Sequence, residues 1–424
     1  MAVKAKTVSV SKAPGLNRRD LLITVTVLLL GTAIVLLGSL GTEAGDRATF
    51  TDQALGTLFS LPSQSTLYTI GALCFLVAGL RLYRGLSSVR MALGLMLAFL
   101  AVFAFLVWMT SGTSLNLPGI MQATLLAATP LTLGAMCGLL CERSGIINIA
   151  IEGMMLSGAF AAVAFAAIFD NLWIGLLGAC LVGGLMAAFH AVLSIKYKVD
   201  QIVSGTVINI LAVGATRFLN IRVLEPAGLS TPGHFETIRI PLLADIPIVG
   251  PLLFDNQPTV YIMLILLVVV NYVVFFTPWG LRMRACGEHP RAADTVGVHV
   301  NRMRYISVII GGLIAGIGGA YFSIGMVGTF EDGMTRGQGF VALAAMIFGN
   351  WHPIGGFLAA LLFGFANALQ VKMQILQPVL PIVNVSIPPE FLQMAPYVLT
   401  IIVVAGLVGR VRPPAQEGKP YEKQ

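Results

Sequence analysis

The sequence predicts an all-α protein, a polytopic bundle of transmembrane helices that contains broken helices and inverted repeats. Apolar residues make up 57% of the 424 residues, and charged residues make up only 11%. Soluble domains carry about 25% charged residues, so this chain lacks the polar side chains that would cover a surface facing water. The mean hydropathy of +0.87 and the apolar runs along the chain indicate that its solvent is lipid.

Twelve apolar stretches are candidates for membrane spans. A helix rises 1.5 Å per residue, so about 20 residues cross a hydrocarbon core of roughly 30 Å. We expect spans at 21–40, 66–82, 91–110, 118–140, 146–168, 172–195, 200–220, 259–277, 305–329, 338–351, 354–374 and 395–410. The stretches 200–220 and 338–351 could instead be re-entrant or broken helices. The first stretch exceeds the 7–15 apolar residues of a signal peptide, so we expect it to be retained.

Basic residues set the expected orientation, because cytoplasmic loops are enriched in Lys and Arg. Basic clusters lie at 4–19, 81–90, 196–198, 282–304 and 410–419. With alternating spans, all of these clusters fall on one side of the membrane. We therefore expect a multi-pass protein of the cytoplasmic (inner) membrane with both termini in the cytoplasm.

Composition also argues against several function classes. The net charge of +7 is small and sits at the chain ends and in loops, which does not favour nucleic-acid binding. The five cysteines show no metal-ligand spacing, and His190 and His352 have no neighbouring ligands in the sequence. The chain has no HExxH and no GxSxG motif. We expect no catalytic residue, no metal and no cofactor.

Two polar interruptions divide the apolar sequence. The first break is residues 141–153 (CERSGIINIAIEG), and the second break is residues 330–340 (FEDGMTRGQGF). In the expected topology the first opens to the cytoplasm and the second to the outside. Unwound segments in two inverted halves are typical of transporters that hold their cargo site near the membrane midplane.

Glu152 is the most informative residue of the first break. A charge at mid-membrane costs about 2.5–3.5 kcal/mol, so its side chain must face a cavity, a partner or the protein interior. It could line a pathway, form an ion pair with Arg143 or cap a nearby helix start. The polar side chains of Gln122, Asn148, Asn209 and Asn367 are milder, and hydrogen bonding between helices is their commoner use.

The segment 277–298 is the most functional-looking loop. We expect Gly287 to break the preceding structure, Pro290 to begin a short helix and Gly297 to end it. This helix is either a connector on the membrane surface or a docking element for a cytoplasmic partner. The loop 221–258 could dock an external partner or serve as a solvated connector. The tail after Arg412 reads as disordered.

Four segments resemble the permeases of ATP-binding-cassette (ABC) importers for branched-chain amino acids, ribose-type sugars and nucleosides. They are ERSGIINIAIEGMMLSGAF, IVSGTVINILA, GLRMRACGEHPRAADTVGV and RGQGFVALAAMIFGNWHPIGGFLAALLFG. The first and last of these segments are most similar to the nucleoside-uptake branch, whose members are often described as simple-sugar permeases. The resemblance covers about 118–410. It implies a permease core over 118–410, after a basic segment (1–20) and an addition of about three helices (21–117), with a cytoplasmic tail at 411–424.

The resemblance implies a non-catalytic subunit that moves nucleosides inward. Its implied partners are a second homologous permease chain, a cytoplasmic ATP-binding-cassette ATPase, an external substrate-binding lipoprotein, a small-molecule substrate and membrane lipid. It also implies that residues 278–304 form the loop that couples to the ATPase. The implied coupling residues are Arg282, Gly287, Glu288, Pro290, Arg291, Ala292, Ala293 and Gly297, and the implied pathway residues are Asn148, Glu152, Asn209 and Gln338.

Two alternatives stay open from the sequence: a permease for ribose-type simple sugars, and a secondary transporter driven by an ion gradient. The chain contains no GxxxxGK[ST] phosphate-binding loop, so a pump built on it needs a separate motor. A single carboxylate within a span, Glu152, gives little support for ion coupling. An ion-driven mechanism also does not explain the basic loop at 278–304.

Overall fold

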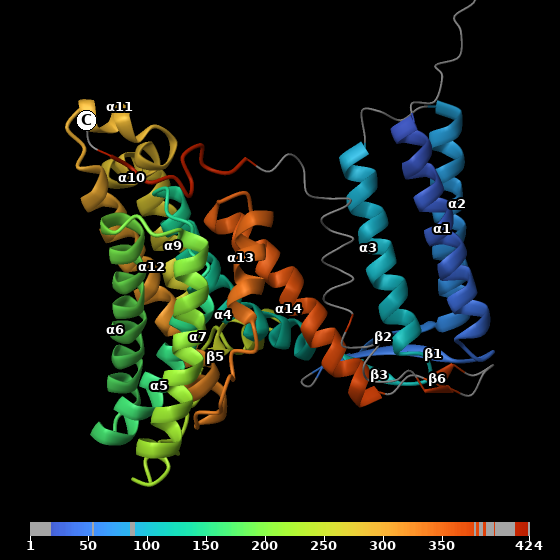
Figure 1. Ribbon diagram of the computed structural model, residues 1–424. Helices are drawn as coiled ribbons and strands as arrows, with labels where there is room; N and C mark the ends of the chain where they lie inside the picture. The colour runs from blue at the N-terminus through green and yellow to red at the C-terminus, as the bar shows by residue number, and fades with distance from the viewer. Residues whose placement is uncertain are drawn as a thin grey trace, which may run out of the picture. The chain divides into compact units, whose positions relative to one another are not determined.

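The computed structural model describes residues 18–52, 55–84, 90–376, 379–380, 385–386, 394 and 412–422. The chain divides into two compact units, residues 1–117 with 372–392 and residues 118–371 with 393–424. Within the described residues, nine helices are long and apolar enough to cross a membrane, and two further apolar helices are shorter. The chain is an all-α, multi-pass membrane protein, as its composition predicts (Figure 1).

The first unit contains three helices and a small sheet that the sequence did not predict. Its elements are α1 (Arg18–Leu40), β1 (Arg47–Asp52), β2 (Gly56–Pro62), α2 (Ser63–Arg84), α3 (Arg90–Met109) and β3 (Ser114–Asn116). β1 pairs antiparallel with β2 and parallel with β3. Helices α1 and α2 pack closely at Gly71, where an added Cβ would lie only 2.5 Å from Val35 Cγ2. The segment 41–65, which lies between the first two expected spans, therefore contains the β1–β2 hairpin.

The helices from α4 onward form most of the second unit. The elements are α4 (Leu117–Arg143), α5 (Ile151–Phe169), α6 (Leu172–Ala191), the π-helix η1 (Val192–Lys196), α7 (Gln201–Leu219), the π-helix η2 (Asn220–Leu224), β4 (Ile238–Arg239), α8 (Val249–Leu253), β5 (Asp255–Asn256), α9 (Pro258–Phe276), α10 (Pro278–Glu288), α11 (Pro290–Thr295), α12 (Val300–Ala320), the π-helix η3 (Tyr321–Val327), α13 (Gln338–Phe348) and α14 (Pro353–Leu376). Two short strands after α14, β6 (Val379–Leu380) and β7 (Val385–Ser386), pair with each other.

Glycines bring α5, α6 and α12 into backbone contact. A Cβ on Gly158 of α5 would lie 2.7 Å from the Cα of Gly316 in α12, and one on Gly183 of α6 would lie 2.4 Å from the carbonyl oxygen of Gly312. Small residues at helix interfaces are the usual route to close packing in membranes. These three helices pack directly against one another in the second unit (Figure 1).

Eleven of the twelve expected spans overlap helices, and the twelfth, 395–410, lies outside the described residues. The expected start of the fifth span at residue 146 is wrong, because α5 begins only at Ile151. Ile146, Ile147 and Ile149 are as apolar as helix residues, so hydropathy alone could not show that the backbone there leaves the helix. The expected short helix at 338–351 is α13, and it covers only 11 residues.

Candidate functional site

The centre of the first break is a short non-helical segment between α4 and α5. Helix α4 ends at Arg143 and α5 begins at Ile151. The N–H groups of residues 144–146 still bond to carbonyls in the last turn of α4, whereas those of residues 147–150 need other acceptors. Asn148 sits at the centre and is fully buried. Its Oδ1 accepts a hydrogen bond from the backbone N–H of Ala150 at 3.0 Å, and its Nδ2 lies 3.2 Å from Cys141 Sγ. The side chain therefore supports the turn into α5.

Helix α7 supplies the hydrogen bonds that the first break lacks. Gln201 Oε1 accepts from the N–H of Ile147 at 2.7 Å, and Asn209 Oδ1 accepts from the N–H of Gly153 at 2.8 Å. Asn209 Nδ2 also donates to the carbonyl of Ile149 at 3.0 Å. Gln201 and Asn209 lie eight residues apart and share one helix face. A buried backbone needs such partners, and here two side chains of α7 provide them.

His190 completes the support of the first break. Its Nε2 lies 2.9 Å from the carbonyl oxygen of Ile147, and its Nδ1 lies 3.1 Å from Ser204 Oγ. A carbonyl can only accept, so Nε2 carries the proton and donates it. This histidine, solitary in the sequence, is fully buried and hydrogen-bonded on both ring nitrogens.

The carboxylate of Glu152 joins the first break to the second. Its Oε1 accepts hydrogen bonds from Thr335 Oγ1 at 2.6 Å and from the N–H of Gly337 at 2.8 Å, and its Oε2 accepts from the N–H of Gly339 at 2.7 Å. Gly337 and Gly339 stand at the start of α13. A helix N-terminus carries partial positive charge, so the carboxylate caps α13 from a different helix. Of the three alternatives for Glu152, the structure shows the cap of a helix start.

Glycine is required at position 339 by the close approach of α5. A Cβ there would lie 2.6 Å from the backbone N and Cα of Glu152, a distance that real Cβ atoms do not show. Gly337 has a φ of +80°, in the left-handed region that favours glycine. Both glycines thus let the backbone of the second break reach the carboxylate.

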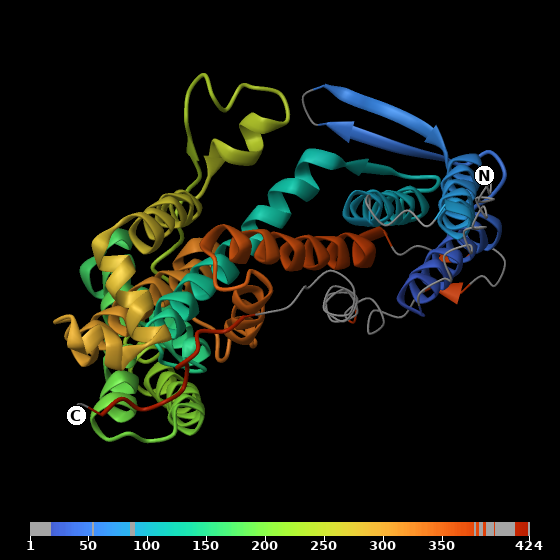
Figure 2. The same cartoon turned by 90° about the horizontal axis from the view of Figure 1, so that it is seen from above.

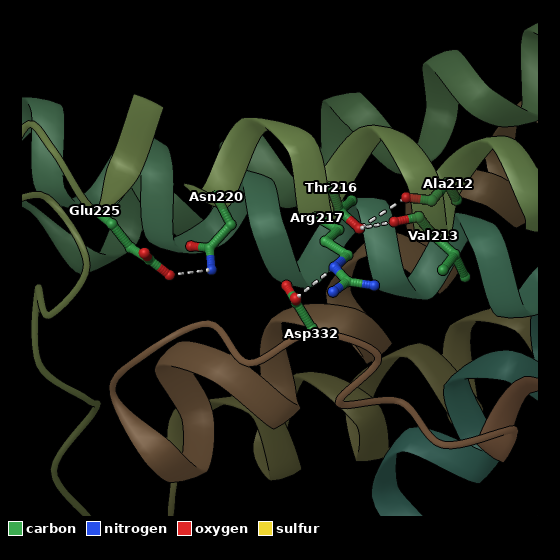
Figure 3. A network of polar contacts seen from close by, with 7 residues as sticks. All are labelled: Ala212, Val213, Thr216, Arg217, Asn220, Glu225 and Asp332. Atoms are coloured by element: carbon green, nitrogen blue, oxygen red, sulfur yellow. Dashed lines mark hydrogen bonds and ion pairs between the residues drawn. The ribbon is translucent and has the colours of Figure 1, made fainter. Parts of the chain in front are cut away.

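A second polar network lies at the far end of α7 (Figure 3). Arg217 Nε lies 3.4 Å from Asp332 Oδ2, and the two side chains are 69% and 42% exposed. In the next turn, Asn220 Nδ2 donates to Glu225 Oε1 at 3.0 Å. Helix α7 therefore contacts both breaks, the first through Gln201 and Asn209 and the second through Arg217.

Three of the four expected pathway residues bind backbone groups of the two breaks, and the fourth is a residue of the second break. Asn148 is wholly buried, whereas Glu152 and Asn209 each keep 9% of their surface exposed. Gln338, partly exposed, is the first residue of α13 between the two glycines that bind Glu152. The sequence reading missed Thr335, although the Thr-x-Gly-x-Gly pattern before an apolar helix is a signal for an anion-binding helix start.

The expected coupling segment, residues 278–304, contains the two short helices α10 and α11 and the first residues of α12. Pro290 begins α11 and Gly297, with a φ of +85°, follows it; both boundaries were predicted. In α11, Pro290 and Ala293 are buried, whereas Arg291 and Ala292 are exposed. Val296, which directly follows the helix, is also exposed.

The expectation that Gly287 breaks the helix is wrong. Helix α10 continues through Gly287 to Glu288, and a Cβ on Gly287 would lie 2.3 Å from the carbonyl oxygen of Arg143. The glycine is therefore needed for contact with the first break. Arg282 is exposed on α10, whereas the Arg143 guanidinium, a candidate partner for Glu152, instead donates through Nε to the carbonyl of Trp351 at 3.0 Å.

The described C-terminal residues, 412–422, are ordered against the second unit, contrary to the expected disorder. Gln416 N–H donates to the carbonyl of Gly287 at 2.9 Å, and Gly418 N–H donates to the carbonyl of Gly145 at 3.2 Å. Figure 1 shows this segment, in dark red, passing beside α10 and ending near α11, and Figure 2 shows it from above, running to the label C. We name residues 412–422 the strap. Polar composition concealed it, because its contacts are mostly made by backbone groups.

Comparisons with known proteins agree with this architecture. The family model described as branched-chain amino acid transport system / permease component matches residues 120–404. A guanosine ABC transporter permease protein, NupQ of Bacillus subtilis, is 43% identical over 312 residues, which are 72% of this chain and 96% of the relative. A nucleoside ABC transporter permease protein, NupC of Lactococcus lactis, is 38% identical over 306 residues, 70% of this chain and 95% of the relative.

A second permease of Bacillus subtilis, the guanosine ABC transporter permease protein NupP, is 27% identical over 252 residues, 57% of this chain and 70% of that relative. No solved structure matches the chain.

Proposed function

This chain belongs to the branched-chain amino acid transport system / permease component family, and on that premise we propose that it carries nucleosides inward across the cytoplasmic membrane as the permease subunit of an ABC importer. The observation that supports a transport pathway is the meeting of two broken helices on the Glu152 carboxylate. Discontinuous helices whose ends face a central site are typical of transporters. The nucleoside substrate rests on the guanosine and nucleoside permeases NupQ and NupC, which this chain matches over nearly their whole length.

The proposed complex contains more than one kind of chain. The sequence has no phosphate-binding loop, so ATP hydrolysis is assigned to a separate cytoplasmic ATPase that docks on the coupling segment. Bacillus subtilis has two different guanosine permease proteins among the relatives of this chain, which supports pairing with a second, homologous permease. An external substrate-binding lipoprotein delivers the nucleoside. The basic clusters support cytoplasmic N- and C-termini.

Within this function, Glu152 and Asn209 hold the two broken helices at the edge of the pathway, and Gln338 faces it. Asn148 has no exposed surface, so its role is to position the first break. The exposed charges of Arg217 and Asp332 mark the external side of the route, because a charged side chain facing lipid within a span is costly.

The test of the function is uptake of radiolabelled nucleosides by vesicles that contain the whole complex. We expect ATP-dependent uptake of guanosine or adenosine that exceeds uptake of ribose, glucose and leucine. Uptake driven by a proton or sodium gradient without ATP would contradict an ABC importer. A preference for free sugars over nucleosides would contradict the assigned substrate.

We predict that the Arg217–Asp332 pair contributes modestly to transport. Arg217→Glu or Asp332→Arg alone should lower uptake roughly 2- to 5-fold, because exposed ion pairs contribute up to about 1 kcal/mol. The double variant that exchanges the charges should recover most of the loss. Arg222→Glu, which reverses an exposed charge one turn further on, is the matched control. No recovery in the double variant would show that the pair does not act together.

A further inference from the structure

The strap contacts each part of the cytoplasmic face that the proposed mechanism needs. Besides the bond from Gln416 to Gly287 of α10, Ala415 N–H donates to Glu288 Oε2 at 3.2 Å. Tyr421 packs against the apolar cluster of Cys286, Ala293 and Val300, which lies under α11. The strap is therefore bound to the same two short helices that form the coupling segment.

The strap also contacts the first break directly. Gly418 N–H donates to the carbonyl of Gly145, and a Cβ on Gly418 would lie 2.7 Å from Ile147 Cδ1. Both glycines adopt left-handed conformations, with φ of +96° for Gly145 and +75° for Gly418. A side chain at position 418 would have to adopt this left-handed conformation and would displace the end of the Ile147 side chain.

A buried arginine connects the strap to the first break a second time. Arg304 of α12 is 1% exposed. Its Nε donates to the carbonyl of Ser144 at 3.2 Å, and its Nη1 donates to the carbonyl of Lys419 at 3.1 Å. A buried guanidinium needs acceptors, and these two come from the first break and from the strap. Removing the strap would leave the cation short of an acceptor.

A carboxyl pair fastens the middle of the strap. The carboxyl of Glu417 lies beside that of Glu142, at the end of α4, and the two groups interact electrostatically. Glu142 is 3% exposed and accepts a hydrogen bond from Trp351 Nε1 at 2.6 Å. Two carboxyl groups can hydrogen-bond to each other only if they share a proton. The fastening is therefore strongest when one of the two is neutral.

We propose that the strap is the mechanical link that transmits movement of the coupling segment to the first break, so that ATPase-driven motion at α10 and α11 reaches residues 144–153. This inference rests on the proposed function. In this arrangement Glu417 and Gly418 are positioning residues: they touch no substrate, and they hold the first break in register with the docking helices.

The principal test is Gly418→Val, because the added side chain meets Ile147 and should lift the strap. The matched control is Gly228→Val, since Gly228 has a similar φ of +69° but nothing within 4 Å of its Cβ position. In the isolated chain in nanodiscs, Gly418→Val should speed hydrogen exchange of the amides at 144–153 at least about tenfold. In the full complex it should raise the ATP hydrolysed per nucleoside transported several-fold.

The control variant should leave both measurements unchanged. Unchanged exchange at 144–153 in Gly418→Val would overturn the proposal, and so would a normal ratio of ATP to nucleoside in a variant whose exchange has increased. A wild-type complex that takes up no nucleoside would count against the proposed function instead. The exchange measurement needs no ATPase, so it still decides whether the strap holds the first break.

The pH dependence of strap attachment is a second arm of the test. Burial raises the pKa of the Glu417 carboxyl above its ordinary value. The titratable group that acts on it is Glu142 on α4. The other charged groups on this part of the strap are Glu288 of α10, which binds the backbone of Ala415, and Arg304 of α12, which binds the backbone of Lys419. Because the docked pKa exceeds that of a detached strap, docking is fully favoured below the ordinary pKa and weakens as the pH rises through the raised one.

Hydrogen exchange of the amides at 144–153 should therefore accelerate as the pH rises through the raised pKa of Glu417. The measured rates are first corrected for the pH dependence of intrinsic amide exchange. Glu417→Gln keeps a hydrogen-bond donor toward Glu142 without needing a shared proton, so it should remove this component of the pH dependence. An identical pH profile in the wild type and in Glu417→Gln would show that the carboxyl pair does not fasten the strap.

Discussion

Replacing Glu152 with Gln should abolish nucleoside uptake and leave the chain inserted in the membrane. The carboxylate accepts three hydrogen bonds, from Thr335 Oγ1 and from the N–H groups of Gly337 and Gly339. A glutamine has the same size, but its amide nitrogen can only donate, so it must face at least one of these donors. An unsatisfied buried group costs roughly 1–3 kcal/mol, and the helix start loses its counter-charge. The second break should then separate from the first.

A series at this position distinguishes the charge from the reach of the side chain. Glu152→Asp keeps the carboxylate but shortens it by one methylene, so it should retain partial uptake. Glu152→Ala leaves all three donors unpaired and should be at least as defective as Glu152→Gln. For each variant, nucleoside uptake and the amount of protein in the membrane are measured together. Gln122→Glu is the control for a polar change elsewhere in a span. Normal uptake by Glu152→Gln would refute the cap as a functional element.

The partners of Glu152 illustrate what the sequence could and could not predict. The two polar interruptions in the apolar sequence predicted unwound segments beside a central site, and the family resemblance supplied Asn148, Glu152, Asn209 and Gln338 as its residues. The sequence could not indicate that the two breaks meet, because Glu152 and Gly339 are 187 residues apart. That contact depends on the packing of α5 against α13, which hydropathy does not describe.

The expected coupling segment and the strap show a second limit of prediction from the sequence. Pro290 and Gly297 delimit α11 through local backbone preferences, so the helix was predictable from the sequence. Gly287 was misread, because a glycine selected for tight packing and a glycine selected for a turn look the same in a sequence. The strap was missed for a related reason: backbone N–H and carbonyl groups, which every residue has, hold it in place.

The second large effect is expected at the exposed face of α11. Val296→Glu should prevent stable association with the ATPase and nearly eliminate uptake, while the chain alone stays folded. Val296 is 79% exposed, so the new carboxylate costs little in the free chain. In a docked interface the same carboxylate would be buried without a partner. That costs roughly 1–3 kcal/mol or more, which corresponds to a 5- to 150-fold loss of affinity.

The choice of residue decides whether this experiment is informative. Ala293 belongs to the implied coupling residues, but it is 3% exposed and packs against Cys286 and Val300. Ala293→Glu would therefore disturb the chain itself, and a loss of uptake would not identify docking. Leu242→Glu, at an 85% exposed apolar residue in the loop 221–258, is the matched control. Because that loop is assigned to the other side of the membrane, it should leave ATPase association unchanged. Equal association of the ATPase with Val296→Glu and with the wild type would place the docking surface elsewhere on the chain.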